Sequence, residues 1–263
     1  IIVNAHRINS GEYPYVNEKE KDFFFMERTD EQSIVALISE LATTRLSAYY
    51  DGIDPIKDIQ ILTPVRKGTL GTASLNTELQ RMLNPPDVMK TEKKLGDRLF
   101  REGDKVMQTR NNYQIGWKKR RDFSEGQGVF NGDIGYIHSI DNDAGQMTVI
   151  FDEDRFVSYE FGQLDEIELA YAMTVHKSQG SEFPIVVMPV SWFPPMLATR
   201  NLLYTAVTRG KKVVILCGMQ RRMEAMVDNN RIKLRFSGLK HRLRALIGRS
   251  IIGSNEEALG NEI

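Results

Sequence analysis

Side chains that can bind phosphate and sugar oxygens are gathered in one short stretch of the chain, residues 170–183. The stretch begins with apolar residues, becomes polar at Thr174, and precedes a second apolar run from Ile185 to Val190. Its hydroxyl, imidazole, ammonium and amide groups come from Thr174, His176, Lys177, Ser178 and Gln179. Such groups suit the backbone contacts that position a nucleic acid without reading its sequence.

Two more residues of this stretch have chemistry that fits a nucleotide. Gly180 would let the backbone approach a ligand closely. Glu182 is a poor neighbour for phosphate, but it can accept a hydrogen bond from a ribose hydroxyl, as acids do in dinucleotide sites. The apolar runs on either side predict a buried strand, a polar loop and a second strand. In open α/β sheets, ligands bind at loops beyond the strand ends, so we expect an α/β fold here.

The stretch resembles motif V of superfamily 1 helicases, in the form found in RecD-like enzymes. A second segment, residues 201–210, reads Asn-Leu-Leu-Tyr-Thr-Ala-Val-Thr-Arg-Gly and is similar to motif VI of the same family. Lys211, Lys212 and the apolar run from Val213 to Leu216 follow it. The two segments stand in the family's order, and the resemblance extends over residues 1–247. It implies a second RecA-like motor domain of the P-loop NTPase fold, with a parallel sheet.

The resemblance also implies roles for individual residues. Arg209 would stabilise charge on a transferring γ-phosphoryl group, because a guanidinium cannot deprotonate; the alternative is a structural ion pair. The resemblance places Gln179, Gly180 and Glu182 beside the nucleotide together with Arg209. It places Thr174, His176, Lys177 and Ser178 against single-stranded DNA. Contacts of this kind go to the DNA backbone, so no base specificity is expected.

A third candidate segment follows the predicted strand of residues 58–64. The basic, glycine-bearing loop of residues 65–71 leads into a predicted helix over residues 72–83. A helix start after such a loop can hold a phosphate, although an ordinary strand-to-helix connection would look the same. Similarity to the family's motif between IV and V implies DNA contacts by Pro64, Arg66, Lys67 and Asn76.

The pattern changes to short strands near residue 97 and returns to longer elements near residue 165. Turn signals at Asn131-Gly132 and residues 142–145 favour a small barrel. RecD-like helicases have an SH3-like barrel here, so we expect it at 97–164, inserted between 1–96 and 165–248 of the RecA-like domain. A basic loop, Trp117–Arg121, could grip a strand and stack a base, or it could simply be solvated.

Other elements are predicted from local patterns. Ile1–Val3 and Phe23–Met26 are predicted strands, a helix begins after Thr29 and ends before Asp51, and residues 219–227 form another helix. The basic segment 229–249 places Leu239, Leu243 and Leu246 on one helical face, which favours docking over DNA binding. Residues 249–263 are expected to form a disordered tail.

Composition sets limits on the class of protein. With 263 residues, 41% hydrophobic and 27% charged, the chain is ordinary for a globular protein. Its net charge is zero, so any DNA surface must be local. A single cysteine excludes an internal disulfide and suits a reducing cytoplasm. Scattered histidines argue against zinc, and no apolar run is long enough for a membrane span. The sequence shows no signal peptide and does not begin with Met, so we expect a fragment.

The parts of a complete ATPase site are missing from the sequence. No phosphate loop occurs, and the Walker B-like run Val149–Glu153 is better explained as a half-buried strand. The resemblance therefore implies ATP and Mg²⁺ in the full-length enzyme, with neither bound by this chain alone. It implies the C-terminal half of a DNA helicase motor acting with a missing N-terminal motor domain and moving 5′ to 3′ on single-stranded DNA. Exonuclease V subunits are further candidate partners, and no membrane is expected. The alternatives are a non-catalytic module that binds single-stranded DNA or a partner, and the helicase half of a conjugative relaxase.

Overall fold

The computed structural model describes residues 1–18, 22–231, 238 and 242–244. Contacts within the chain define one compact unit over residues 1–230, and this unit is described below. The predictions for Leu239, Leu246 and the tail at 249–263 lie outside the described residues.

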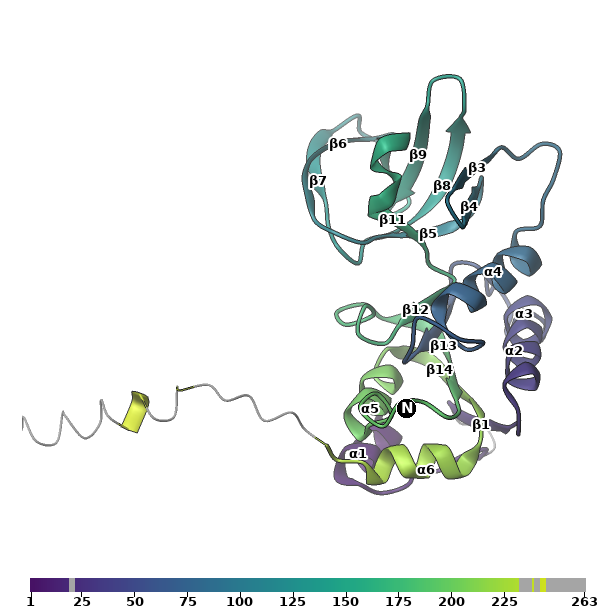
Figure 1. Cartoon of the computed structure of the whole chain (residues 1–263), viewed down its shortest axis with the longest axis vertical. Coiled ribbons are helices and arrows are strands. Elements are labelled where there is room, and N and C mark those ends of the chain that lie inside the picture. Colours follow the sequence, from purple (N-terminus) through teal and green to yellow (C-terminus); the bar gives the residue numbers. More distant parts are fainter. Residues whose placement is uncertain (19–21, 232–237, 239–241, 245–263) are drawn as a thin grey trace, which may run out of the picture. The chain divides into compact units, whose positions relative to one another are not determined.

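Five parallel strands form the sheet that carries the predicted motifs (Figure 1). The strands are β1 (Phe23–Glu27), β2 (Ile59–Thr63), β12 (Ala172–Thr174), β13 (Phe183–Val190) and β14 (Gly210–Gly218). Their order across the sheet is β1-β14-β13-β2-β12. Two of them precede an antiparallel region in the sequence and three follow it. The sheet is therefore assembled from both sides of an insertion, as the change in sequence pattern predicts.

Helices cover both faces of this sheet. They are α1 (Ile2–Ser10), α2 (Glu31–Glu40), the π-helical η1 (Leu41–Arg45), α3 (Leu46–Tyr49), α4 (Thr72–Leu83), α5 (Arg200–Val207) and α6 (Gln220–Asp228). In β14, Val214 and Leu216 pack into the core formed with α1, α5 and α6. Val213 and Ile215 belong to the opposite core, formed with α2 and α4. Burial on both faces explains why this strand is a continuous apolar run.

The antiparallel region, called here the β insert, comprises residues 92–169. A hairpin is formed by β3 (Glu92–Leu95) and β4 (Arg98–Arg101). A seven-stranded sheet contains β5 (Lys105–Gln108), β6 (Asn112–Lys119), β7 (Glu125–Val129), β8 (Ile134–Asp141), β9 (Gln146–Phe151), β10 (Arg155–Glu160) and β11 (Ile167–Leu169), and the 3₁₀ helix η2 (Phe161–Glu166) precedes β11. These strands extend beyond the predicted limits of 97 and 164.

Two sequence interpretations inside the β insert have clear outcomes. Met147, Val149 and Phe151 of β9 are fully buried, so the Walker B-like run is a half-buried strand, as predicted. The basic segment at Trp117 was predicted to be a loop, and this is wrong for its first part. Residues Trp117 to Lys119 end strand β6, where they pair with Phe156 and its neighbours on β10.

The first residues of the chain also differ from expectation. The predicted strand at Ile1–Val3 is instead the start of helix α1. Helical spacing places Asn4, Ala5 and Ile8 on its buried face, and the three leading apolar residues hide this pattern in the sequence. The Asn4 side chain exchanges two hydrogen bonds with the backbone of Tyr15, which holds the helix in place.

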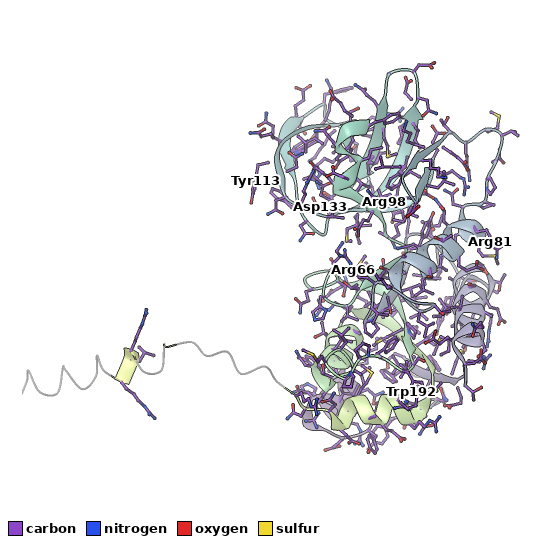
Figure 2. The ribbon with its side chains drawn as sticks, in the orientation of Figure 1. Arg66, Arg81, Arg98, Tyr113, Asp133 and Trp192 are labelled. Atoms are coloured by element: carbon purple, nitrogen blue, oxygen red, sulfur yellow. The ribbon has the colours of Figure 1, made fainter. Side chains whose placement is uncertain are left out.

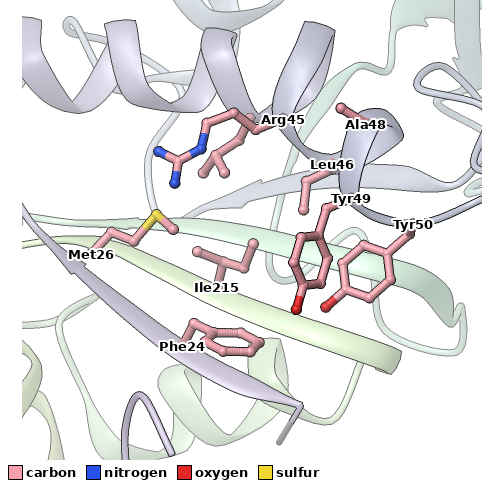
Figure 3. A pocket seen from close by; sticks show the side chains of 9 residues that line it. Phe24, Met26, Arg45, Leu46, Ala48, Tyr49, Tyr50 and Ile215 are labelled. Atoms are coloured by element: carbon pink, nitrogen blue, oxygen red, sulfur yellow. The ribbon is translucent and has the colours of Figure 1, made fainter. Parts of the chain in front are cut away.

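The segment from α2 to α3 ends before Asp51, as predicted, but it is not a regular α-helix throughout. Asp30 accepts a hydrogen bond from Ser33 N and caps its start. The hydroxyls of Thr43 and Thr44 donate to the carbonyls of Ser39 and Glu40, which favours irregular π-helical geometry at η1. Beneath this segment lies an apolar hollow of about 430 Å³, lined by Phe24 and Tyr49 among others (Figure 3). None of the predicted site residues lines it.

Candidate functional site

The predicted DNA-contacting residues lie at the carboxyl ends of two neighbouring strands. Thr174 ends β12 and pairs with Thr63, which ends β2. The loops that follow, residues 64–71 and 175–182, therefore start beside each other. Arg66, Lys67 and His176 are exposed on these loops, while Thr174 and Lys177 are half-buried.

A single carboxylate forms ion pairs with two of these residues, Lys177 and Arg66. Glu168, on β11 of the β insert, accepts a hydrogen bond from Lys177 Nζ at 2.8 Å. Its other oxygen lies 3.5 Å from the Arg66 guanidinium. Figure 2 labels Arg66 and, on the β insert, Arg98, whose side chain donates to the carbonyl of Ile167. The β insert and the parallel sheet thus meet at this cluster.

The protonation of Glu168 is set by two opposing effects. Partial burial would raise the pKa of its carboxyl. The hydrogen bond from Lys177 and the charges of Lys177, Arg66 and Arg98 outweigh burial and hold that pKa below its ordinary value. Glu168 is therefore ionised at neutral pH, and it orders the two cations while partly neutralising them.

Glycines and a buried hydroxyl shape the Arg66 loop. Thr63 donates its hydroxyl to the carbonyl of Leu70 at 2.7 Å, which closes the loop. A Cβ at Gly71 would lie 2.6–2.7 Å from backbone atoms of Arg66 and Lys67, so only glycine fits there. The loop presents its two cations to solvent because its backbone turns back tightly on the start of α4.

Three predicted DNA contacts are buried and support the loops from inside. The Asn76 amide accepts from Ala172 N at 2.8 Å and donates to the carbonyls of Ala172 and Leu169 at 2.9 and 3.0 Å. The Ser178 hydroxyl is fully buried and donates to Val175 O at 2.8 Å. Pro64 is buried as well. Because these side chains face the protein interior, our proposed DNA surface omits them.

The predicted nucleotide-side residues gather at the opposite end of the sheet. Phe183 begins β13 and pairs with Gly210, which begins β14. Gln179, Gly180 and Glu182 precede the first of these strands, and Arg209 precedes the second. Loop 175–182 therefore runs from the carboxyl end of β12 to the amino end of β13, and it lies beside both groups of predicted residues.

Arg209 is held by neutral acceptors. Its guanidinium donates to the carbonyls of Thr205 and Ser181 at 3.2 and 3.1 Å and to the Thr208 hydroxyl at 3.1 Å. No carboxylate of a described residue lies within ion-pair distance of it, which argues against the structural ion pair considered above. The next residue in the chain is a glycine, because a Cβ at position 210 would lie 2.4 Å from Val214 Cγ2. The charge of Arg209 is thus oriented without being neutralised.

The other nucleotide-side residues are exposed. Gly180 has a φ of 91°, a conformation that favours glycine, and so its first role is in the turn itself. The Glu182 carboxylate lies 3.3 Å from Lys211 Nζ, and both side chains are more than half exposed. Gln179 is exposed beside them. Among the described residues, no group of His, Cys, Asp and Glu has the arrangement of a metal site.

Sequence reasoning missed the polar contacts that join the β insert to the parallel sheet. Asp104 is fully buried and accepts hydrogen bonds from Gln80 at 2.6 Å, Asn84 at 2.7 Å and the Tyr171 hydroxyl at 2.9 Å. The neighbouring Lys105 is also buried, with Nζ 3.3 Å from the carbonyl of Ile59. Adjacent Asp and Lys in a short strand look like solvent-facing residues, so no signal in the sequence pointed to this junction.

Comparison with known proteins identifies the two parts of the fold. Residues 75–151 match the family described as the SH3 domain of ATP-dependent RecD-like DNA helicases. Residues 169–217, which contain both motif segments, match the UvrD-like helicase C-terminal domain. The RecA-like sheet with its inserted SH3-like barrel is therefore that of a DNA helicase motor half.

The chain belongs to the RecD-like helicases. It is 32% identical over 187 residues to the ATP-dependent RecD2 DNA helicase of Deinococcus radiodurans, covering 71% of this chain and 24% of that protein. It is 29% identical over 197 residues to the RecBCD enzyme subunit RecD of Mycolicibacterium smegmatis, covering 74% of this chain and 31% of the relative. The chain thus spans about a quarter to a third of these relatives.

Solved structures show a more distant likeness. The crystal structure of Bacteroides Pif1 bound to single-stranded DNA aligns with 95% of this chain and 54% of its own chain, at 15% identity and a TM-score of 0.48.

No helix in the described part of the chain is both long and apolar enough to cross a membrane.

Proposed function

We propose that this chain is the C-terminal motor half of an ATP-dependent helicase that translocates on single-stranded DNA in the 5′ to 3′ direction. The observation that carries the proposal is the environment of Arg209. Its guanidinium is fixed by three neutral acceptors and keeps its full charge available for a γ-phosphate. A positioned arginine of this kind stabilises the charge of phosphoryl transfer.

The DNA side of the proposal rests on Arg66, Lys67, His176 and Lys177. They come from adjacent loops at the carboxyl ends of β2 and β12. Arg66, Lys67 and Lys177 carry positive charges suited to phosphate, and the His176 imidazole can form a hydrogen bond to it. Loop 175–182 joins them to the Arg209 end of the sheet within a few residues. A shift of this loop would therefore connect nucleotide state with grip on DNA.

ATP and Mg²⁺ would be held chiefly by an N-terminal motor domain outside this chain. In support, the 263 residues contain no phosphate loop. The residues that accept hydrogen bonds from the Arg209 side chain are Ser181, Thr205 and Thr208, which do not form a magnesium site. Gln179, Gly180 and Glu182 would complete the nucleotide pocket from this side. Subunits of an exonuclease V complex are proposed partners, because RecBCD RecD subunits are among the relatives.

A non-catalytic module that binds single-stranded DNA is the second candidate. The same lack of a phosphate loop favours it for these 263 residues taken alone. The helicase half of a conjugative relaxase remains a third, and sequence upstream of Ile1 would distinguish it.

The test of the ATP side uses the longer protein that contains both motor domains. Arg209→Ala should lower DNA-stimulated ATP turnover at least about 100-fold, since arginine fingers contribute about 10³–10⁵ in rate. Arg209→Lys should not rescue, because it lacks the planar fork of donors. Nucleotide binding should change less than turnover. Near-normal turnover in Arg209→Ala would refute the proposed role.

The matching test of the DNA side uses Lys177→Ala. Binding to single-stranded DNA should weaken by a similar factor for all sequences. The slope of log affinity against log salt should fall by up to about 0.7, the value for one phosphate contact on a single strand. Arg81→Ala is a matched control, since Arg81 is an exposed cation on α4 that pairs locally with Glu78. An equal loss in both variants would show that Lys177 has no specific role.

A further inference from the structure

Helices cover one face of the parallel sheet incompletely at its β1 edge. Phe23 and Phe25 of β1 are buried in one core, while Phe24 and Met26 point to the opposite face. On that face α2 packs over β14 and β13, and Phe24 and Met26 on the edge strand are only half-buried. Parallel sheets normally have both faces covered. This part of the face is therefore open to a binding partner.

The apolar hollow described above lies over this open part of the sheet, and it is called here the β1 hollow (Figure 3). Phe24, Met26 and Ile215 form its floor, with Phe24 opposite Ile215 in the register of β1 and β14. The segment from η1 to α3 contributes Arg45, Tyr49 and other lining residues. Its volume of about 430 Å³ lies within the range of about 300–1,000 Å³ that is usual for ligand pockets.

Arg45 gives the β1 hollow a positive charge. Among the described residues, it is the only charged side chain in the lining. The carboxylate of Glu40 lies 3.8 Å from its guanidinium, and both side chains are about half exposed, so this ion pair is weak. Figure 3 shows the Arg45 side chain extending from the helical segment toward β1. The guanidinium can therefore bind an anion that is attached to an apolar group in the hollow.

The residue types and the openness of the β1 hollow favour a protein ligand over a small molecule. Phenylalanine, tyrosine, methionine and arginine, which are all present here, are enriched where proteins meet. Tyr49 is 79% exposed, and its ring contacts that of Tyr50 edge to face, with 4.8 Å between the centroids. A second hollow of about 200 Å³ shares both tyrosines and also contains the opposite charges of Lys212 and Asp51. A surface that continues in this way suits a segment of chain, whereas small-molecule sites enclose most of their ligand.

The backbone around the β1 hollow limits how a partner can approach. Asn17 exchanges two hydrogen bonds of 2.9 Å with the backbone of Phe25, so at this residue the outer edge of β1 is not free to pair with another strand. A partner would therefore bind through side chains on the face of the sheet. The π-helical η1 lies directly above that face, and π-helical turns are rare and frequent at functional sites.

We propose that the β1 hollow is a docking site for a segment of a partner protein in which an apolar side chain lies next to a carboxylate. The apolar side chain would fill the hollow over Phe24 and Ile215, and the carboxylate would pair with Arg45. An anchor side chain that fills a pocket commonly dominates the energy of an interface. The Lys177 cluster lies beside β12, at the opposite edge of the sheet from β1. Docking therefore leaves the proposed DNA surface free.

The first test compares two fluorescent probes on the 263-residue chain. Anilinonaphthalene sulfonate carries an aromatic body and an anion, and phenylnaphthylamine has the same body without the charge. The wild type should bind the sulfonate more tightly, because Arg45 can pair with it. Arg45→Gln should reduce this preference by about threefold to fivefold, in line with a partly exposed ion pair. Arg81→Gln, which removes an exposed cation that pairs locally with Glu78, is the matched control.

Filling the β1 hollow gives a second variant. Ala48 lines the hollow and is exposed on α3, so Ala48→Phe adds a ring there without removing a core side chain. It should weaken binding of both probes at least about fivefold, because the added ring takes their space. Ala225→Phe, at an exposed alanine of α6, is the matched control. Equal binding of the sulfonate by the wild type, Arg45→Gln and Ala48→Phe would overturn the site.

Displacement of the sulfonate by peptides tests the kind of ligand. A short capped peptide that joins phenylalanine and leucine to glutamate should displace it from the wild type, and the glutamine counterpart should do so less well. Arg45→Gln should remove the difference between the two peptides. Failure of both peptides to displace the bound sulfonate would overturn the protein partner and leave a site for small anions only. Ala48→Phe should not change affinity for single-stranded DNA, so the outcome is independent of the DNA-binding function proposed above.

Discussion

At the scale of single residues, the DNA-side cations are already partly neutralised within the protein. Glu168 lies between Lys177 and Arg66 and keeps both side chains ordered. A phosphate must compete with this carboxylate or share the cations with it. Glu168 would therefore limit how tightly the loop can hold a strand, which would suit the translocation proposed above.

Glu168→Gln should raise affinity for single-stranded DNA. The side chains of the pair are partly exposed, at 22% for Lys177 and 40% for Glu168, so solvent screens their attraction. Exposed pairs are typically worth about 0.2–1 kcal/mol, which corresponds to an increase of up to about fivefold. Anisotropy titrations at several salt concentrations should also show a steeper salt dependence. Asp165→Asn is the control, because Asp165 pairs with Arg110 away from the cluster; weaker binding by Glu168→Gln would contradict the competition.

At the scale of elements, α4 positions the motif V loop through a single side chain. Asn76 satisfies an N–H and two carbonyls where β11 leads into β12. β11 and β12 are edge strands of their sheets, so backbone groups on their outer sides have no partner strand. The role implied for Asn76 by resemblance was DNA contact, whereas its side chain supports the start of β12, from which the proposed DNA-contacting loop leaves.

Asn76→Ala should destabilise the fold and loosen the loop. Buried polar groups left without partners cost about 1–3 kcal/mol, which urea unfolding would measure. Thr77→Ala is the neighbouring control on the exposed side of the same helix, with only a local bond to Ala73 O. Equal stability of the two variants would show that Asn76 is dispensable. Binding to single-stranded DNA should weaken in Asn76→Ala, as a secondary effect of the disordered loop.

At the scale of the whole molecule, the β insert is joined to the parallel sheet through buried polar groups. Burial raises the pKa of Asp104, although hydrogen bonds from Asn84, Arg101 N, Gln80 and Tyr171 act in the opposite direction. Burial lowers the pKa of Lys105 to about 7, against the charges of Asp54 and Asp58. Buried polar groups such as Asp104 and Lys105 need specific hydrogen-bond partners. They therefore favour one arrangement of the β insert against the parallel sheet within the compact unit.

The buried Lys105 should make the stability of the folded chain depend on pH. Its folded pKa of about 7 lies below its unfolded value of about 10.4. Between these values the unfolded chain binds more protons, so the Lys105 contribution to the free energy of unfolding rises with pH. The slope is at most about 1.4 kcal/mol per pH unit. Urea unfolding from pH 7 to pH 9 should show this slope in the wild type relative to Lys105→Met, which cannot titrate. Parallel curves for the two proteins would contradict it.

The isolated 263-residue chain should not hydrolyse ATP. It contains no phosphate loop, and no group of acidic side chains in its described part is arranged for a metal. A phosphate-release assay with single-stranded DNA present should give background rates for the wild type and for Arg209→Ala alike. Turnover that Arg209→Ala abolishes would reveal a complete site within this chain.

The sequence alone determined the motif segments, the RecA-like sheet with its inserted barrel, and most elements that carry the motifs. Strands such as β13 and β14 and helix α4 follow from apolar runs and periodicity, which are local signals. The sequence-based prediction was wrong at Ile1–Val3, where a strand was expected. The buried face of α1 depends on residues that are distant in the sequence.

Only the tertiary structure decided which polar side chains face solvent. Asn76 and Ser178 look like ligands in the sequence but are buried, and Asp104 and Lys105 look exposed but form the junction. The contact of Glu168 with Lys177 and Arg66 likewise requires β11 to meet two loops of the parallel sheet. Hydrogen bonds and ion pairs between distant segments depend on how those segments pack, and no local pattern of residues encodes them.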